Sequence, residues 1–138
     1  MHRKTLIALL GAMIIAVAAA GSALAAGSGP AVHVQIKSLT KTLRSVTVHG
    51  ETGWITKGGT PRGKCSGNSA AGALDAATHG KWGGKYYSGL GIFVTSILGV
   101  TPKGKDSWAV YVNGRLSSKG VCGVPLHRGQ TLLFKVVK

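Results

Sequence analysis

Few residues of this sequence have the types and spacing that catalysis requires. The only acidic residues are Glu51, Asp75 and Asp106, and their wide separation along the chain does not indicate an acid/base pair. No Gly-x-Ser-x-Gly motif marks a serine nucleophile. The glycine pairs at 58–59 and 83–84 lack the Gly-Lys-Ser ending of a phosphate-binding loop. We therefore predict that the protein is not an enzyme; the alternative is a hydrolase whose catalytic residues meet only in the fold.

The histidines and cysteines indicate structural rather than chemical roles. His33, His49, His79 and His127 are far apart and form no i, i+4 pair, so no metal site is expected. The two cysteines, Cys65 and Cys122, are too few and too widely spaced for a zinc site. In an exported protein such a pair predicts one disulfide, which stabilises the fold by about 4 kcal/mol for a loop of this length.

The aromatic residues are the stronger functional signal. Trp82, Tyr86 and Tyr87 follow the expected helix in a glycine-rich stretch that predicts a flexible connector. Rings on a loop held by a rigid scaffold are suited to contacting a ligand. The alternative is that they cover an open edge of the core. Trp108, in the strand that also contains Tyr111, is predicted to be a core residue.

The N-terminus predicts export. A short cationic segment precedes residues 5–20, which carry no charge, and Ala23 and Ala25 form the A-x-A pattern read by signal peptidase. We expect residues 1–25 to be a signal peptide, the chain's only contact with the membrane, and residues 26–138 to be one secreted domain. The alternative is an uncleaved anchor, because the apolar run approaches the length that crosses a bilayer.

The composition is strongly basic. Lys and Arg number 17 against 3 Asp and Glu, which gives a formal net charge of +14. This charge predicts attraction to polyanions such as cell-wall polymers, anionic lipid surfaces or nucleic acid. The basic residues form no continuous block and do not alternate with aromatic residues, so no specific nucleic-acid binding is expected. A basic surface without a dedicated partner is the alternative.

Hydrophobic periodicity predicts strands on both sides of a single helix. Five segments follow the pattern of strands: residues 32–36, 43–48, 92–98, 108–112 and 131–137. A further short strand is expected near Trp54. The helix is expected over residues 70–78, with Ser69 as a cap and Gly80 as the left-handed residue at its end. Asn113-Gly114 is typical of a type I′ hairpin turn. The fold class is therefore α+β, with one helix packed on a sheet.

Several motifs follow one another in a specific order. They are residues 69–77 (SAAGALDAA), 80–84 (GKWGG), 89–97 (GLGIFVTSI), 108–114 (WAVYVNG), 120–122 (GVC) and 126–134 (LHRGQTLLF). Together they resemble the small C-terminal domain shared by transcobalamin and intrinsic factor, and its exported bacterial relatives in particular. The resemblance extends over nearly all of residues 26–138.

The resemblance implies a β-grasp-like mixed sheet around one helix. In the vitamin carriers this domain closes over one face of cobalamin, while a helical barrel without a counterpart in this sequence holds the other face. The contacts come partly from the segment at residues 91–95 here and from the strand that begins at Trp108. We therefore expect a ligand surface composed of Trp82, Tyr86, Gly91, Phe93, Thr95, Trp108 and Tyr111.

Two functions follow from these observations. The first is a secreted, non-enzymatic ligand-binding or interaction module that contacts cobalamin, another flat and partly apolar molecule, or a cell-surface partner. The second is a basic protein that adheres to anionic cell-wall polymers, in which case binding would fall steeply with salt. No resident cofactor is expected in either case.

Overall fold

The computed structural model describes residues 29–138, so the predicted signal peptide lies outside the described residues. The elements follow in the order β1 (Ala31–Lys37), β2 (Thr42–His49), η1 (Lys57–Gly59), α1 (Ala70–Thr78), β3 (Trp82–Tyr87), β4 (Gly91–Ile97), β5 (Ser107–Val112), β6 (Arg115–Leu116), η2 (Val121–Gly123) and β7 (Thr131–Val137). None of the helices in this part of the chain is long and apolar enough to cross a membrane.

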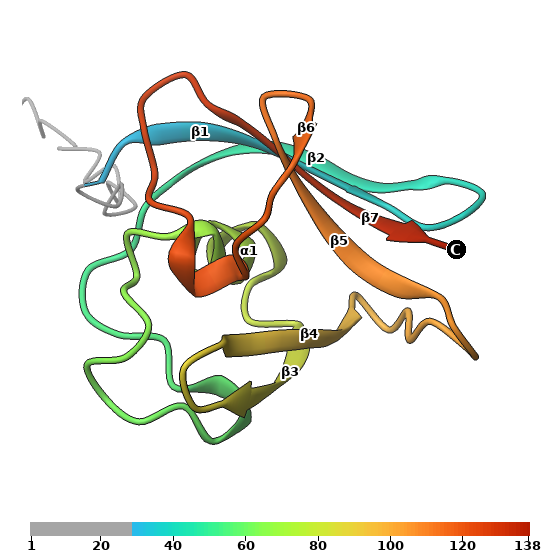
Figure 1. Cartoon of the computed structure of the whole chain (residues 1–138). Coiled ribbons are helices and arrows are strands. Elements are labelled where there is room, and N and C mark those ends of the chain that lie inside the picture. Colours follow the sequence, from blue (N-terminus) through green and yellow to red (C-terminus); the bar gives the residue numbers. More distant parts are fainter. Residues whose placement is uncertain (1–28) are drawn as a thin grey trace, which may run out of the picture.

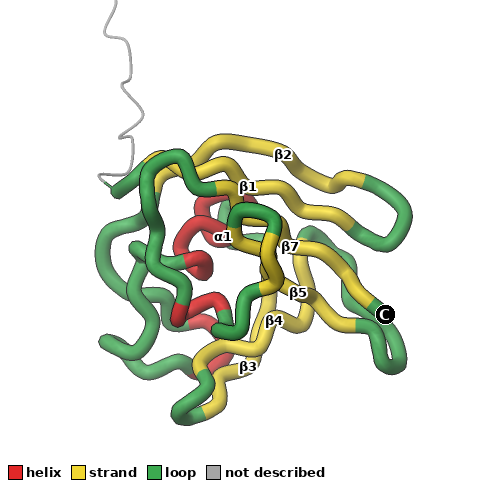
Figure 2. Tube along the Cα trace, turned by 45° about the horizontal axis from the view of Figure 1, so that its top comes forward, coloured by secondary structure: helices red, strands yellow, loops and turns green. Residues whose placement is uncertain are grey.

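The strands form two sheets with the helix between them. The larger sheet has the order β2-β1-β7-β5-β6, in which β1 and β7 are parallel and the other pairs are antiparallel. Strands β3 and β4 form a separate antiparallel hairpin. Helix α1 lies beneath the larger sheet and above the hairpin in Figure 1, and Figure 2 shows the same three layers in a turned view. The predicted α+β class with a mixed sheet and a single α-helix is confirmed for the described residues.

The inner face of the larger sheet provides much of the hydrophobic core. Val34 and Ile36 on β1 and Leu132 and Phe134 on β7 are fully buried, because alternate residues of a strand point to the same face. Among the described residues, the buried apolar side chains run from Val32 on β1 to Val136 on β7, so the first and last strands both contribute to the core.

Helix α1 packs closely because its buried side chains are small. A Cβ atom at Gly72 would lie 1.7 Å from the carbonyl oxygen of Gly67, so this contact admits only glycine. Ser69 occupies the N-cap position, but its hydroxyl donates to the carbonyl of Ser66 at 2.6 Å instead of capping the helix. The helix ends through two left-handed residues, His79 (φ 52°) and Gly80 (φ 77°), rather than through Gly80 alone.

The prediction of a flexible connector after the helix was wrong. Residues Trp82–Tyr87 form strand β3, which pairs with β4 from Trp82↔Ile97 to Tyr87↔Gly91. Glycine usually weakens a strand, but here it permits a close approach, since a Cβ atom at Gly84 would lie 2.4 Å from Cγ2 of Ile92. The strand's glycines reflect packing against β4 rather than mobility.

Three smaller predictions have clear outcomes. The turn between β5 and β6 has positive φ angles at Asn113 (49°) and Gly114 (83°), as a type I′ turn requires. The short strand expected near Trp54 is only an isolated bridge to Ser66. The disulfide joins Cys65 to Cys122, with a Cα–Cα distance of 5.0 Å, and so ties the loop before α1 to η2.

Candidate functional site

An exposed apolar surface lies at the end of the β3–β4 hairpin. Leu90, in the turn, is 79% exposed; Phe93 on β4 is 52% exposed; and Tyr87 on β3 is 43% exposed. They surround a shallow pocket of about 480 Å³ that is also lined by Gly91, Ile92 and Gly120. We call the surface formed by Tyr87, Leu90 and Phe93 the hairpin face.

The pairing of β3 with β4 determines which side chains reach this face. Tyr87 lies opposite Gly91 and Lys85 lies opposite Phe93, so these four residues share the outer side of the hairpin. The turn is closed by a hydrogen bond from the Leu90 N–H to the Tyr87 carbonyl at 3.0 Å. Since Gly91 has no side chain, Tyr87 and Phe93 are separated by open backbone.

The disulfide and a cation fix the surroundings of the hairpin face. An added Cβ atom at Gly91 (φ 86°) would lie 3.4 Å from Cβ of Cys122, so the disulfide packs against the backbone of β4 at this residue. The ammonium of Lys85 lies 5.3 Å from the centre of the Tyr87 ring, a cation–π distance that adds positive charge at the rim. The arrangement combines apolar contact with positive charge.

A second depression continues the hairpin face towards strand β5. It has a volume of about 300 Å³ and shares Ile92, Phe93 and Gly120 with the first pocket. The exposed side chain of Leu116 contributes to its wall. Phe93 therefore stands between two connected hollows, and this central position makes it the main candidate for a ligand contact.

The structure distributes the seven predicted ligand residues over three places. Gly91, Phe93 and Thr95 alternate along the outer side of β4 and belong to the hairpin face or its border. Tyr86 lies on the opposite side of the hairpin and packs against the core. Tyr111 points to the outer face of the larger sheet, opposite Leu133, because its neighbours on β5 pack inward.

The remaining two predicted residues are tryptophans in the interior. Trp82 is 5% exposed, and its indole N–H donates to Oδ1 of Asp75 at 2.8 Å. Trp108 is also buried and donates to the carbonyl of Val100 at 3.2 Å. The core position predicted for Trp108 is confirmed. Trp82 therefore reaches no exposed surface, whereas Trp108, although only 8% exposed, contributes to the lining of the second depression beside Phe93.

The two leucines of this surface were not named among the predicted ligand residues, although Leu90 lies in the segment 82–91 that was expected to form the surface. Leu90 and Leu116 carry no periodic signal, since each lies in or next to a short turn. A large apolar residue between glycines, as in Ser88-Gly89-Leu90-Gly91, could have marked the hairpin tip as a contact site, because turns are usually polar.

The fold also brings together two carboxylates that the sequence left unpaired. Burial, followed by the neighbouring charge of Asp75 and a hydrogen bond to it, raises the pKa of Glu51 from 4.5 to about 7. Such a pair can share a proton near neutral pH. Neither residue lines the two hollows of the hairpin face. Among residues 29–138, no three or more His, Cys, Asp or Glu side chains lie close enough to hold a metal ion.

Two solved structures share this fold. The structure of haptocorrin in complex with Cbi matches with a TM-score of 0.58 and 16% sequence identity, over 79% of this chain and 25% of haptocorrin. A candidate metal-binding protein from Ruminococcus gnavus ATCC 29149, solved at 1.30 Å, matches with a TM-score of 0.60 and 11% identity, over 79% of this chain and 97% of its own. The predicted resemblance is thus confirmed for the fold.

The family is shown by the sequence itself. The chain belongs to the family described as a domain of unknown function, DUF4430, which it matches over residues 67–138. No curated protein matches the chain. Both structural neighbours are described by what they bind and not as enzymes.

Proposed function

We propose that the chain is a ligand-binding module that acts outside the cytoplasm and holds one side of a flat, partly apolar molecule, such as a corrinoid, on its hairpin face. The observation that carries the proposal is the exposure of Tyr87, Leu90 and Phe93 around one pocket. Clustered apolar exposure of this kind marks interaction sites in monomeric domains. Covering one such side chain contributes about 1.5–3 kcal/mol when burial is complete.

The shape and chemistry of the hairpin face support a planar ligand. Gly91 and Gly120 line the pocket without side chains, so a flat ring system can approach the backbone between the apolar walls. Lys85 at the rim can pair with a carboxylate or phosphate group at the ligand's edge. A ligand with an apolar plane and a polar periphery satisfies both features.

A one-sided site limits the affinity that this domain provides alone. Small-molecule sites usually enclose most of their ligand's surface, whereas both hollows here are open to solvent. A second protein surface covering the far side of the ligand would supply the remaining buried area. We therefore expect weak binding by the isolated chain and tighter binding when such a partner is present.

Two observations support a location outside the cytoplasm. The Cys65–Cys122 disulfide persists in oxidising compartments and is rare in the cytosol. The N-terminal residues also have the pattern of a signal peptide. Cell-wall association is a further expectation from the positive charge.

The test is a titration of residues 26–138 with cobinamide and cobalamin, following tryptophan fluorescence at low and high salt. We expect saturable quenching that changes little with salt. Phe93→Ala should weaken it about tenfold through lost apolar contact without lowering the melting temperature. Leu39→Ala, at an apolar residue that is exposed to a similar degree and lies outside this face, is the matched control. Unchanged affinity in Phe93→Ala would refute the site.

A further inference from the structure

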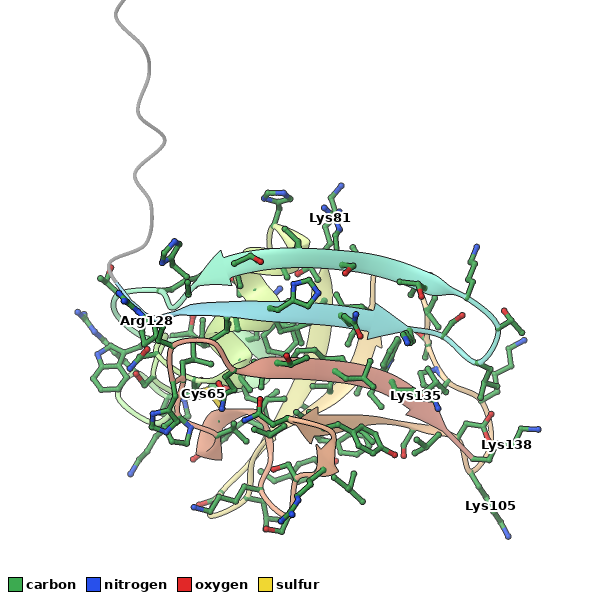
Figure 3. The ribbon with its side chains drawn as sticks, turned by 90° about the horizontal axis from the view of Figure 1, so that it is seen from above. Cys65, Lys81, Lys105, Arg128, Lys135 and Lys138 are labelled. Atoms are coloured by element: carbon green, nitrogen blue, oxygen red, sulfur yellow. A yellow bond between two sulfur atoms is a disulfide. The ribbon has the colours of Figure 1, made fainter. Side chains whose placement is uncertain are left out.

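A second surface, separate from the hairpin face, gathers basic residues at one end of the larger sheet. It consists of six lysines, Lys37, Lys41, Lys103, Lys105, Lys135 and Lys138, which we call the strand-end face. Five of them are exposed and Lys37 is partly exposed. In Figure 3, Lys105, Lys135 and Lys138 lie together at one end of the sheet, while Arg128 lies at the other.

Strand pairing explains why lysines distant in sequence meet there. Strands β1 and β7 run in parallel with Lys37 opposite Lys135, so both strands finish at the same end. Ser107, at the start of β5, lies opposite Val137, which brings the preceding loop with Lys103 and Lys105 to that end as well. The β1–β2 turn contributes Lys41.

The strand-end face also has an apolar component. Leu39, at the tip of the β1–β2 turn, is 50% exposed. With Val100, Pro102 and Val136 it lines a hollow of about 330 Å³, whose rim includes Lys103. Asp106 is the one acidic residue of this hollow, so the charge around the apolar tip remains strongly positive.

We propose that the strand-end face docks on an anionic lipid surface, with Leu39 entering the interfacial layer and the lysines contacting the headgroups. An apolar tip between cations gains from a lipid interface, which offers negative charge and an apolar layer together. A soluble polyanion offers only the charge.

The length of the sheet separates these lysines from the basic residues at its other end, such as Arg128. Strand β1 has seven residues, so the opposite end of the sheet lies about 20 Å away. That distance exceeds the screening length of about 10 Å at 0.1 M salt. Basic residues at the far end therefore contribute little to attraction by a membrane that contacts the strand-end face.

Vesicle co-sedimentation of residues 26–138 tests the proposal. Vesicles of phosphatidylcholine with about 30% phosphatidylglycerol are compared with phosphatidylcholine alone at 0.1 M salt. The Lys103→Gln/Lys105→Gln/Lys135→Gln variant should lose on the order of 100-fold in partitioning, about fivefold per lysine. The control, Arg62→Gln/Lys64→Gln/Arg128→Gln, removes the same charge from exposed residues elsewhere and should lose less than fivefold.

Leu39→Ser separates a lipid surface from a soluble polyanion. It should lower vesicle partitioning several-fold and leave binding to inorganic polyphosphate unchanged. Equal losses in the two triple variants would overturn the proposal, as would no preference for anionic vesicles or full vesicle binding by Leu39→Ser. If the first triple variant does not fold, Lys103→Gln/Lys105→Gln, confined to an exposed loop, gives the same comparison. A negative result here leaves the hairpin face untouched, since the two faces share no residue.

Discussion

Replacing Glu51 with glutamine should stabilise the protein above pH 7, although the substitution makes an already basic chain more positive. Burial and the adjacent Asp75 raise the pKa of Glu51 from 4.5 to about 7 in the folded protein. The folded state therefore holds a proton that the unfolded state has released between these pH values. The stability that this proton provides is fully present below pH 4.5 and is lost as the pH rises through about 7.

The magnitude follows from the size of the shift. A rise from 4.5 to about 7 corresponds to an upper bound of about 3 kcal/mol. Glu51 is only partly buried, so solvent screening reduces the expected effect to about 1 kcal/mol. Glutamine retains a donor towards Asp75 and carries no charge. The variant should thus match the wild type near pH 4.5 and exceed its unfolding free energy by about 1 kcal/mol at pH 8.

Urea unfolding at several pH values between 4.5 and 8.5 measures this difference directly. Subtracting the wild-type curve cancels every contribution that the two proteins share. Asp106→Asn is the matched control, because it removes the same charge from a residue close to lysines and should not stabilise. A Glu51→Gln variant that is destabilised at pH 8 to the same extent as this control would refute the reasoning.

Three further predictions concern the packing that supports the hairpin face. Trp82→Ala should lower the unfolding free energy by about 3–5 kcal/mol, because the indole is buried and also donates a hydrogen bond to Asp75. Thermal unfolding measures this loss, and a small loss would mean that the core does not need the ring. Gly72→Ala should prevent stable folding or lower the unfolding free energy by more than about 2 kcal/mol, because the methyl group would overlap a backbone carbonyl. Thermal unfolding followed by circular dichroism measures this, and a native-like melting curve would contradict the contact. Replacing Cys65 and Cys122 with alanine should lower the unfolding free energy by about 4 kcal/mol, measured by urea unfolding against the oxidised wild type. A loss below about 1 kcal/mol would show that the loop is already ordered without the disulfide.

Two electrostatic features of the protein could not be predicted from the sequence: the pair of Glu51 with Asp75, and the strand-end face. Glu51 and Asp75 are 24 positions apart, and only the packing of the loop against α1 puts them side by side. The six lysines of the strand-end face form no continuous run, since four separate segments bring them together. Linear spacing carries no signal for contacts of this kind, which depend on strand order and register.

What the sequence determined by itself was the local structure and the class of the fold. Alternation at Val32, Val34 and Ile36 specified a strand with one buried face, the alanine-rich segment specified a helix able to lie close to its neighbours, and Asn113-Gly114 specified the turn. These properties depend on neighbouring residues, whose periodicity is visible along the chain. The motif order, compared with a known family, supplied the arrangement of the elements.

Only the tertiary structure decided which aromatic residues of β3 are buried and which apolar residues of the hairpin are exposed. Trp82 and Tyr87 belong to the same strand, yet Trp82 packs over the helix while Tyr87 reaches the solvent. Residues five apart in a strand point to opposite faces, so the two rings separate because Trp82–Tyr87 is a strand paired with β4 and not the flexible connector that the sequence predicted. The site follows from that pairing, which is a property of two strands together and not of either segment alone.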